Sequence, residues 1–428
     1  MTDLVSPLNA GVRKREVLGW ALYDFANSGY TTVVLTAVFN AFFVGVVAGN
    51  QPWATLAWTL ALAASNLLLM MIMPLLGAQA DRHASKKRWL GLSTGGCVLA
   101  TAALAMVGPG DVALAMLLIV LSNAFYSVGE SLTAAFLPEL ATAEGMGRVS
   151  GWAWSLGYFG GMLTLGLSLA HVLQAKAAGQ MAAQFVPVTM LITAGVYGLA
   201  ALPTFVLLRE RAVPRVHAGL AWAQVWQRQR EVWTAARAHV DFVALLQCTF
   251  AYQCGISVVI ALAAVYAEQV LGFGQTETMM LVFLVNIAAA AGAFVLGHLQ
   301  DRFGHQRLLA TTLLGWIVMT VLAFLARDRS LFWLAAVLAG LCMGSSQSAG
   351  RAMVGLLAPG GRVAEYFGLW TFATRLAAIV GPVSYGLVVW LTAGQHRLAI
   401  LSTALFFAAG WWRLRRVNLA RGRAVALA

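Results

Sequence analysis

Four charged side chains lie inside long apolar stretches of this sequence, where charge is rare. Of the 16 acidic residues, only Asp24 and Glu130 lie clearly within such stretches, and the basic residues there are Arg351 and Arg375. Charge in an apolar surrounding is costly, so these side chains are functional candidates. Arg351 is a candidate for binding a carboxylate, because a guanidinium presents a rigid fork of donors.

Polar residues accompany Asp24 at helical spacing. Asn27, Ser28 and Thr31 follow it at i+3, i+4 and i+7, which places four polar groups on one face of a helix. Facing a cavity, Asp24 is a candidate for taking up a proton and coupling the protein to a proton gradient. The alternative is that Asp24, only about seven residues into its apolar stretch, pairs with a nearby cation.

Three later apolar stretches carry comparable polar faces. Their members are Asn123, Ser127 and Glu130, then Tyr252, Gln253 and Ser257, then Ser345, Gln347, Ser348 and Arg351. Any one of these residues is equally explained by a hydrogen bond between neighbouring helices. Four polar faces together favour a water-accessible cavity suited to a polar or zwitterionic solute.

The composition indicates what kind of structure positions these residues. The chain has 428 residues, 60% of them hydrophobic and 10% charged, whereas soluble domains have about 25% charged residues. A helix crosses a bilayer with roughly 20 apolar residues. The sequence therefore predicts an all-α polytopic membrane protein with twelve transmembrane helices, near Val17–Val47, Trp53–Ala78, Trp89–Val107, Val112–Leu137, Val149–Val172, Phe185–Leu208, Phe242–Ala267, Thr276–Leu299, Leu308–Ala326, Leu331–Leu357, Ala364–Leu391 and Leu398–Trp412.

The distribution of basic residues tests that count and sets the orientation. With the N-terminus in the cytoplasm, 22 of the 28 Lys and Arg residues fall on the cytoplasmic side, 4 fall outside and 2 lie within spans. This asymmetry follows the positive-inside rule. It predicts that both termini are cytoplasmic, in a multi-pass protein of the plasma (inner) membrane. It also explains the net charge of +12 without nucleic acid as a partner.

The chain divides into two six-helix bundles, residues 1–208 and 240–428, the second with a basic cytoplasmic tail. They are joined by a cytoplasmic linker, residues 209–239. An amphipathic linker helix on the membrane surface is predicted from Trp222, Val225, Trp226, Trp233 and Ala236, interleaved with Arg228, Arg230 and Arg237. The alternative is a regulatory helix that binds a partner.

The two bundles repeat one another. Gly77, Asp81 and Arg82 end the second predicted span, and Gly297, Asp301 and Arg302 end the eighth, each offset by 220 residues. Gly147-Arg148-Val149 opens the fifth span as Gly361-Arg362-Val363 opens the eleventh. Internal repeats of this kind build many transporter folds, with the solute site between the repeats.

The two Gly-x-x-x-Asp-Arg loops, each followed by basic residues, resemble the signature loop of the major facilitator superfamily. The first copy has Ala84 and Ser85 where a glycine is common. A finer resemblance, to the vacuole-effluxer-like branch, covers essentially the whole chain. It is carried by Trp20-Ala-Leu-Tyr-Asp24-Phe-Ala-Asn27-Ser28-Gly-Tyr30, Glu130-Ser-Leu-Thr-Ala-Ala-Phe-Leu-Pro138-Glu139-Leu, Gly147-Arg-Val-Ser-Gly-Trp152, Gln347-Ser-Ala-Gly-Arg351 and Glu365-Tyr-Phe-Gly-Leu.

The resemblance implies a major facilitator fold, with the first, fourth, seventh and tenth spans lining a central cavity and the signature loops acting in the conformational switch. Glu130 and Arg351 are offset by 221 residues and are expected at near-equivalent places on spans that face one another. They are predicted to form an ion pair that closes the inner gate. The alternatives are a permanent structural pair, or separate pairing of each charge within its own half.

The expected function is secondary active transport by alternating access of a small polar or zwitterionic solute, with amino-acid efflux implied by the branch. A lipid-handling scramblase and a non-transporting nutrient receptor on the same fold are the alternatives. No phosphate-binding loop, nucleophile elbow or metal-ligand grouping occurs, and the four cysteines lie in apolar runs. We therefore expect no enzyme activity, cofactor or metal, and a monomer in the lipid bilayer whose partners are its solute and, under the coupling hypothesis, protons.

Overall fold

The computed structural model describes residues 6–49, 51–213, 231, 234, 236–273 and 275–427. Its elements are helical, with one isolated β-bridge between Leu8 and Ala141. Most of the residues used to predict the amphipathic linker helix, from Trp222 to Trp233, lie outside the described ranges. That prediction therefore stays open.

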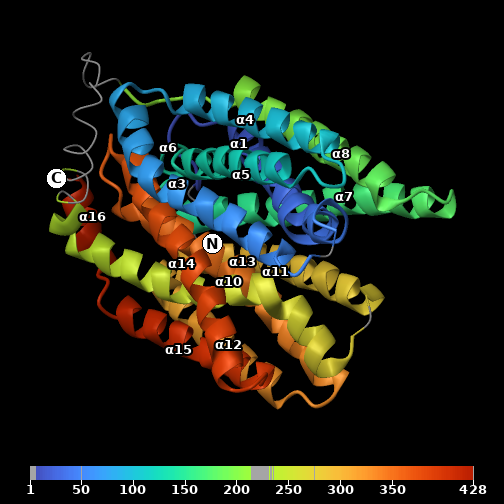
Figure 1. Ribbon diagram of the computed structural model, residues 1–428. Coiled ribbons are helices and arrows are strands. Elements are labelled where there is room, and N and C mark those ends of the chain that lie inside the picture. Colours follow the sequence, from blue (N-terminus) through green and yellow to red (C-terminus); the bar gives the residue numbers. More distant parts are fainter. Residues whose placement is uncertain are drawn as a thin grey trace.

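Twelve long helical segments make up the described part of the chain (Figure 1). In the first half these are α1 (Lys14–Tyr30) with η1 (Thr31–Ala37), α2 (Phe39–Phe42) and η2 (Phe43–Val47), then α3 (Ala54–Arg82), α4 (Lys86–Ala103) with η3 (Leu104–Met106), α5 (Val112–Ala134) with the short α6 (Leu137–Leu140), α7 (Met146–Ala177) and α8 (Ala182–Leu207). In the second half they are α10 (Val240–Leu271), α11 (Gln275–Phe303), α12 (His305–Leu325), α13 (Arg329–Leu357), α14 (Val363–Leu391) and α15 (His396–Leu414), followed by α16 (Leu419–Leu427).

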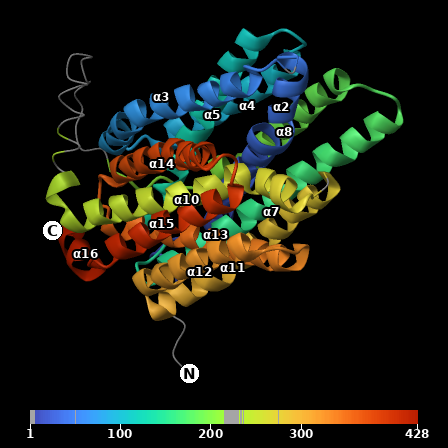
Figure 2. The ribbon, with the colours of Figure 1, turned by 60° about the horizontal axis from the view of Figure 1, so that its bottom comes forward.

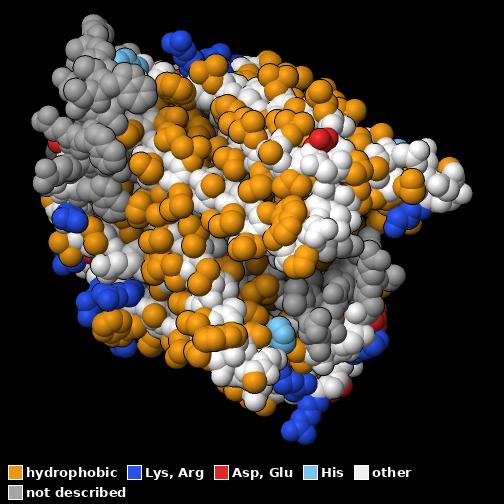
Figure 3. Space-filling model, viewed as in Figure 1, with side chains coloured by type: hydrophobic (Ala, Val, Ile, Leu, Met, Phe, Trp, Pro, Cys, Tyr) orange, Lys and Arg blue, Asp and Glu red, His pale blue; other side chains and the backbone are white. Residues whose placement is uncertain are grey.

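The apolar surface follows from the composition. Eleven of the segments in the described residues are long and apolar enough to cross a membrane, and α15 is the twelfth predicted span. His396, Arg397 and Arg413 occupy the ends of α15 and lower its mean hydropathy. Figure 3 shows hydrophobic side chains spread over one broad face, with Lys and Arg near its edges. The chain is thus an integral multi-pass membrane protein, and the all-helical prediction is confirmed.

The packing repeats between the halves. In the first half α1 packs against α8, and α4 packs against α5 and α8; in the second α10 packs against α15, and α12 packs against α13 and α15. The halves meet mainly where α3 contacts α14 and α7 contacts α11 and α13. Figures 1 and 2 both show the first half, blue to green, lying over the second half, yellow to red.

One end of the bundle carries the basic segments and is called the basic end below. Here lie the first turn of α1, the α3–α4 junction, the first turns of α7 and α14, the α11–α12 junction, and α16. At this end an acidic residue in the first turn of each half's first helix pairs with an arginine that follows the last long helix of the same half. Glu16 binds Arg211 at 2.8 Å, and Asp241 binds Arg421 at 2.8 Å. These pairs tie the first helix of each half to the segment that follows its last long helix.

The first span departs from a regular helix. After α1 it continues through two π-helical stretches, Thr31–Ala37 and Phe43–Val47. Stretches of π-helix are rare and occur often at functional sites. Here they follow directly after the polar face that Asp24, Asn27 and Ser28 begin.

Candidate functional site

A buried ion pair joins the two halves through Asp24 and Arg351. Asp24 is eleventh in α1, and Arg351 lies two turns before the end of α13. One terminal nitrogen of Arg351 donates to Asp24 Oδ2 at 2.5 Å, and the two side chains are only 3% and 11% exposed. Because water solvates neither charge, each depends on the other half of the protein for its partner.

The other two nitrogens of Arg351 also donate to the first half. Its Nε donates to Ser150 Oγ at 3.1 Å, and its other terminal nitrogen donates to the Ser150 carbonyl at 2.9 Å. The guanidinium carbon lies 5.0 Å from the Trp20 ring centroid and 5.2 Å from that of Trp154. Flat aromatic faces stabilise a cation in this position. Arg351 is therefore held by α1 and α7 together.

The predicted pair between Glu130 and Arg351 is wrong for this conformation. Glu130 on α5 instead accepts from Arg375 on α14 at 2.5 Å. The repeat placed Glu130 and Arg351 at similar depths, but depth does not decide which helices are neighbours. Across the interface α5 contacts α14 while α13 contacts α7. The alternative of pairing within each half is wrong as well, since both pairs join one half to the other.

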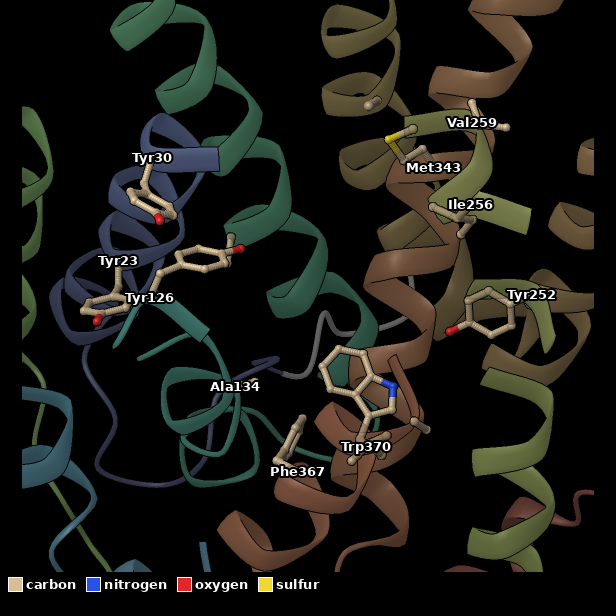
Figure 4. Close-up of a cluster of buried hydrophobic side chains, with 14 of the residues drawn as sticks. Tyr23, Tyr30, Tyr126, Ala134, Tyr252, Ile256, Val259, Met343, Phe367 and Trp370 are labelled. Atoms are coloured by element: carbon tan, nitrogen blue, oxygen red, sulfur yellow. The ribbon is translucent and has the colours of Figure 1, made fainter. Parts of the chain in front are cut away.

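The Glu130–Arg375 pair has a different setting. Its side chains are 31% and 17% exposed, so it is considerably more open than the buried pair. Tyr126, one turn before Glu130, donates its hydroxyl to the Glu130 carboxylate at 3.1 Å, and the Arg375 guanidinium lies 5.8 Å from the Tyr126 ring centroid. The Arg375 Nε is buried and has no hydrogen-bond partner. Figure 4 shows Tyr126 extending from α5 toward the second half.

The aspartates of the two signature loops make equivalent contacts at the basic end. Asp81, at the end of α3, accepts from the backbone N–H of Glu365 in the first turn of α14 at 2.9 Å. Asp301, near the end of α11, accepts from the N–H of Gly147 at 3.0 Å and from the N–H and Nε of Arg148. A carboxylate satisfies the free N–H groups of a helix N-terminus and complements its dipole. Each loop thus caps the fifth helix of the opposite half.

The glycines of the loops permit this approach. A Cβ on Gly77 would lie 2.3 Å from the carbonyl oxygen of Ala364, and a Cβ on Gly297 would lie 3.0 Å from that of Gly147. Arg82 and Arg302, predicted to act in the switch, form no ion pair within the described residues; Arg302 lies over the Phe303 ring.

Charged and aromatic side chains gather beside the α14 cap. Arg362 pairs with Glu365, and His239 lies edge-on to Tyr366, with ring centroids 5.5 Å apart. Burial, and next the nearby Arg362 guanidinium, lower the pKa of His239. Both causes favour the neutral imidazole.

Several predicted site residues bond to their own half. Asn27 accepts from Tyr197 at 2.7 Å, Asn123 donates to Ser65 at 3.0 Å, and Gln253 donates to Gln347 at 2.8 Å. The backbone carbonyl of Ser28 accepts from Thr31 and Thr32. These contacts match the simpler explanation, in which polar side chains join neighbouring helices.

Some buried polar atoms of the site have no hydrogen-bond partner, and three of them belong to side chains not yet described. The hydroxyls of Ser127 and Tyr252 and the indole nitrogen of Trp370 are buried and unpaired. Figure 4 shows Tyr252 on α10, at the second-half side, and Trp370 with Phe367 on α14 nearer to Ala134. Unpaired polar atoms are costly and mark places where water or a ligand would bind.

Sequence reasoning missed Ser150, Trp154, Tyr126 and Trp370. Tyr126 carried a usable signal, because it precedes Glu130 by four residues and a helix brings such pairs together. Ser150 lies in the motif from Gly147 to Trp152, but nothing in the sequence indicated its partner Arg351, which is 201 residues away.

The contacts between the halves are one-sided. Within the described ranges, the hydrogen bonds and ion pairs that we find between the halves lie between the basic end and the level of Arg375, about 18 Å into α14 at 1.5 Å per residue. The deepest is the Glu130–Arg375 pair. The halves are therefore closed upon each other at the basic end.

The fold is of the major facilitator type. Its structure is similar to the human organic anion transporter MFSD10 (TETRAN), with a TM-score of 0.74 and 16% identity, covering 94% of this chain and 99% of that one. It is also similar to the proton:xylose symporter XylE, with a TM-score of 0.74, 15% identity and 93% and 94% of the chains covered. A third similar structure is that of a bacterial homologue of the iron transporter ferroportin in an outward-facing state. Its TM-score is 0.69 at 14% identity, covering 94% of this chain and 98% of that one.

The sequence identifies the family. Residues 53–427 match the model of the family described as vacuole effluxer Atg22 like. The chain belongs to that family. It is 27% identical over 404 residues to the uncharacterized MFS-type transporter YxiO of Bacillus subtilis (strain 168), covering 91% of this chain and 92% of that protein. It is also 27% identical over 177 residues to autophagy-related protein 22 of Cryptococcus neoformans var. neoformans serotype D (strain B-3501A), covering 38% of this chain and 32% of that protein.

Proposed function

We propose that this protein is a secondary transporter that works by alternating access and carries a small zwitterionic solute, with amino-acid efflux as the first candidate. The Glu130–Arg375 pair carries the proposal, because it offers one acid and one base from opposite halves with both side chains partly exposed. The family description, vacuole effluxer Atg22 like, supports efflux. The basic end is taken to face the cytoplasm by the positive-inside rule.

A zwitterion suits this pair chemically. The Arg375 guanidinium matches a carboxylate with its fork of donors, and the Glu130 carboxylate matches an ammonium group. The solute's ammonium group takes the place of Arg375 at Glu130, and its carboxylate takes the place of Glu130 at Arg375. Solute binding therefore loosens a contact between the halves. Tyr126 supplies an aromatic face and a hydroxyl beside both charges.

Proteoliposomes with an imposed pH gradient and a panel of radiolabelled amino acids test the function. We expect saturable uptake or release of at least one amino acid, and a pH-gradient dependence if protons are coupled. Binding without flux would indicate the receptor alternative, and lipid flip-flop without solute flux would indicate the scramblase. Either result would contradict the proposal.

Glu130→Gln is expected to raise the KM for the solute about tenfold or more, because the ammonium group loses a charged partner. Thermal stability should change little, since the pair is partly exposed. Glu144→Gln, the same change at a carboxylate that is 74% exposed at the basic end, serves as a control for a general change of charge. An unchanged KM in Glu130→Gln would remove Glu130 from the solute site.

A further inference from the structure

The outer surface near the basic end contains a groove that the proposed transport site does not use. The groove has a volume of about 560 Å³ and lies where α1, α7 and α11 meet. A volume of this size is typical of a ligand site. Its lining is mainly apolar, and its sides are open to the exterior: Leu18, Phe159 and Phe294 are 54%, 52% and 48% exposed.

The groove is polarised along its length. On α1 its residues are Lys14, Val17, Leu18 and Ala21, at i, i+3, i+4 and i+7. On α7 they are Arg148, Trp152, Ser155, Leu156 and Phe159, which follow one face over eleven residues. Both helices begin at the basic end, so the two cations lie together at the membrane surface. The apolar walls then run about 16 Å along the helices from there.

Lys14 and Arg148 both have hydrogen-bond donors free to bind a further anion. Lys14 is exposed and forms no ion pair within the described residues. Arg148 gives its Nε to Asp301 at 3.2 Å, and its two terminal nitrogens have no acceptor in the described part of the chain. The segment Ser6–Leu8 covers the same end, fixed by the bridge from Leu8 to Ala141.

We propose that this groove binds one anionic phospholipid of the cytoplasmic leaflet. Its phosphate lies between Lys14 and Arg148, and one acyl chain follows the apolar walls of α1 and α7. Charge complementarity selects the anionic headgroup, since basic pockets between transmembrane helices on the cytoplasmic side suit such lipids. The length and openness of the walls suit an acyl chain that enters sideways from the bilayer.

The bound lipid would favour the conformation described above. Phe294 comes from the second half and Lys14 from the first, so the groove is complete only while the halves meet at the basic end. A ligand that binds one conformation better than another shifts the population toward it. The phosphate also joins Arg148, which already bridges the halves through Asp301.

Native mass spectrometry of the delipidated full chain tests the headgroup. The protein is titrated with phosphatidylglycerol and with phosphatidylcholine of the same acyl chains. We expect one phosphatidylglycerol to bind at least about tenfold more tightly than phosphatidylcholine, and Lys14→Glu to abolish that preference. Arg15→Glu, an equal change at an exposed neighbour outside the groove, should keep it. Equal binding of the two lipids, or equal loss in both variants, would overturn the proposal.

A second pair of variants tests the acyl chain. Leu18→Gln places an amide in the groove wall and is expected to weaken phosphatidylglycerol at least about fivefold. Leu163→Gln makes the same change at another exposed leucine, 49% exposed and outside the groove, and should not. Both leucines are on the exterior, so both variants should fold. If the two variants behave alike, the lipid does not lie in the groove.

Discussion

Asp24→Asn is expected to shift the protein strongly toward a conformation open at the basic end and to reduce transport at least about tenfold. The substitution leaves Arg351 buried with its charge unpaired while the basic end is closed. Removing one partner of a buried ion pair costs about 3–5 kcal/mol, equivalent to more than a hundredfold in a conformational equilibrium. Opening lets water reach Arg351, so the cost falls on the closed conformation. Flux in proteoliposomes measures the effect.

A double variant separates loss of the pair from general damage. In Asp24→Asn with Arg351→Gln no charge is left unpaired, so the closed conformation should recover relative to Asp24→Asn alone. Arg351→Lys should remain impaired, because an ammonium group cannot bond Asp24 and both Ser150 acceptors in the same geometry. If the effects of Asp24→Asn and Arg351→Gln, measured singly, simply add in the double variant, the two side chains do not act as a pair.

Gly77→Ala is expected to prevent closure of α3 against α14. The added methyl would lie 2.3 Å from the carbonyl oxygen of Ala364 and 2.7 Å from its carbonyl carbon, so backbone must move. Alanine otherwise favours a helix over glycine, so the effect on an isolated α3 would be favourable. A cysteine at Ser348, which is fully buried between the halves, should react at least about tenfold faster with a water-soluble thiol reagent in this variant.

Two glycines provide graded controls for that experiment. Gly297→Ala meets its nearest backbone atoms at 3.0 Å and should give a smaller increase in reactivity than Gly77→Ala. Gly95→Ala in α4 has nothing within 4 Å and should give no increase. The same reactivity in all three variants would show that the α3–α14 contact does not control access.

The sequence predicted which charged residues lie between the halves better than it predicted their partners. Asp24, Glu130, Arg351 and Arg375 stand out because charge inside an apolar span is rare. Their pairing depends on which helix faces which across the interface, and a repeat offset gives only depth along the helices. The offset therefore suggested Glu130 for Arg351, whereas α13 lies against α7 and brings Arg351 to Ser150 and Asp24.

The same limit applies to the loops and the first span. The repeated Gly-x-x-x-Asp-Arg pattern located Asp81 and Asp301, but the N–H groups they accept from belong to helices of the other half. Only tertiary structure supplies that information. The π-helical stretches after α1 carried no sequence signal either, since their residues are ordinary apolar ones with threonines.

Distances between the halves, measured by electron paramagnetic resonance, test most directly whether the Asp24–Arg351 pair holds the basic end closed. Spin labels at exposed Arg88 and Arg307 report on the basic end, and labels at exposed Ala178 and Arg327 report on the opposite end. The four buried cysteines are first replaced by alanine. In Asp24→Asn we predict a longer basic-end distance and a shorter distance at the opposite end than in the unsubstituted protein. Unchanged distances at the basic end would contradict the account.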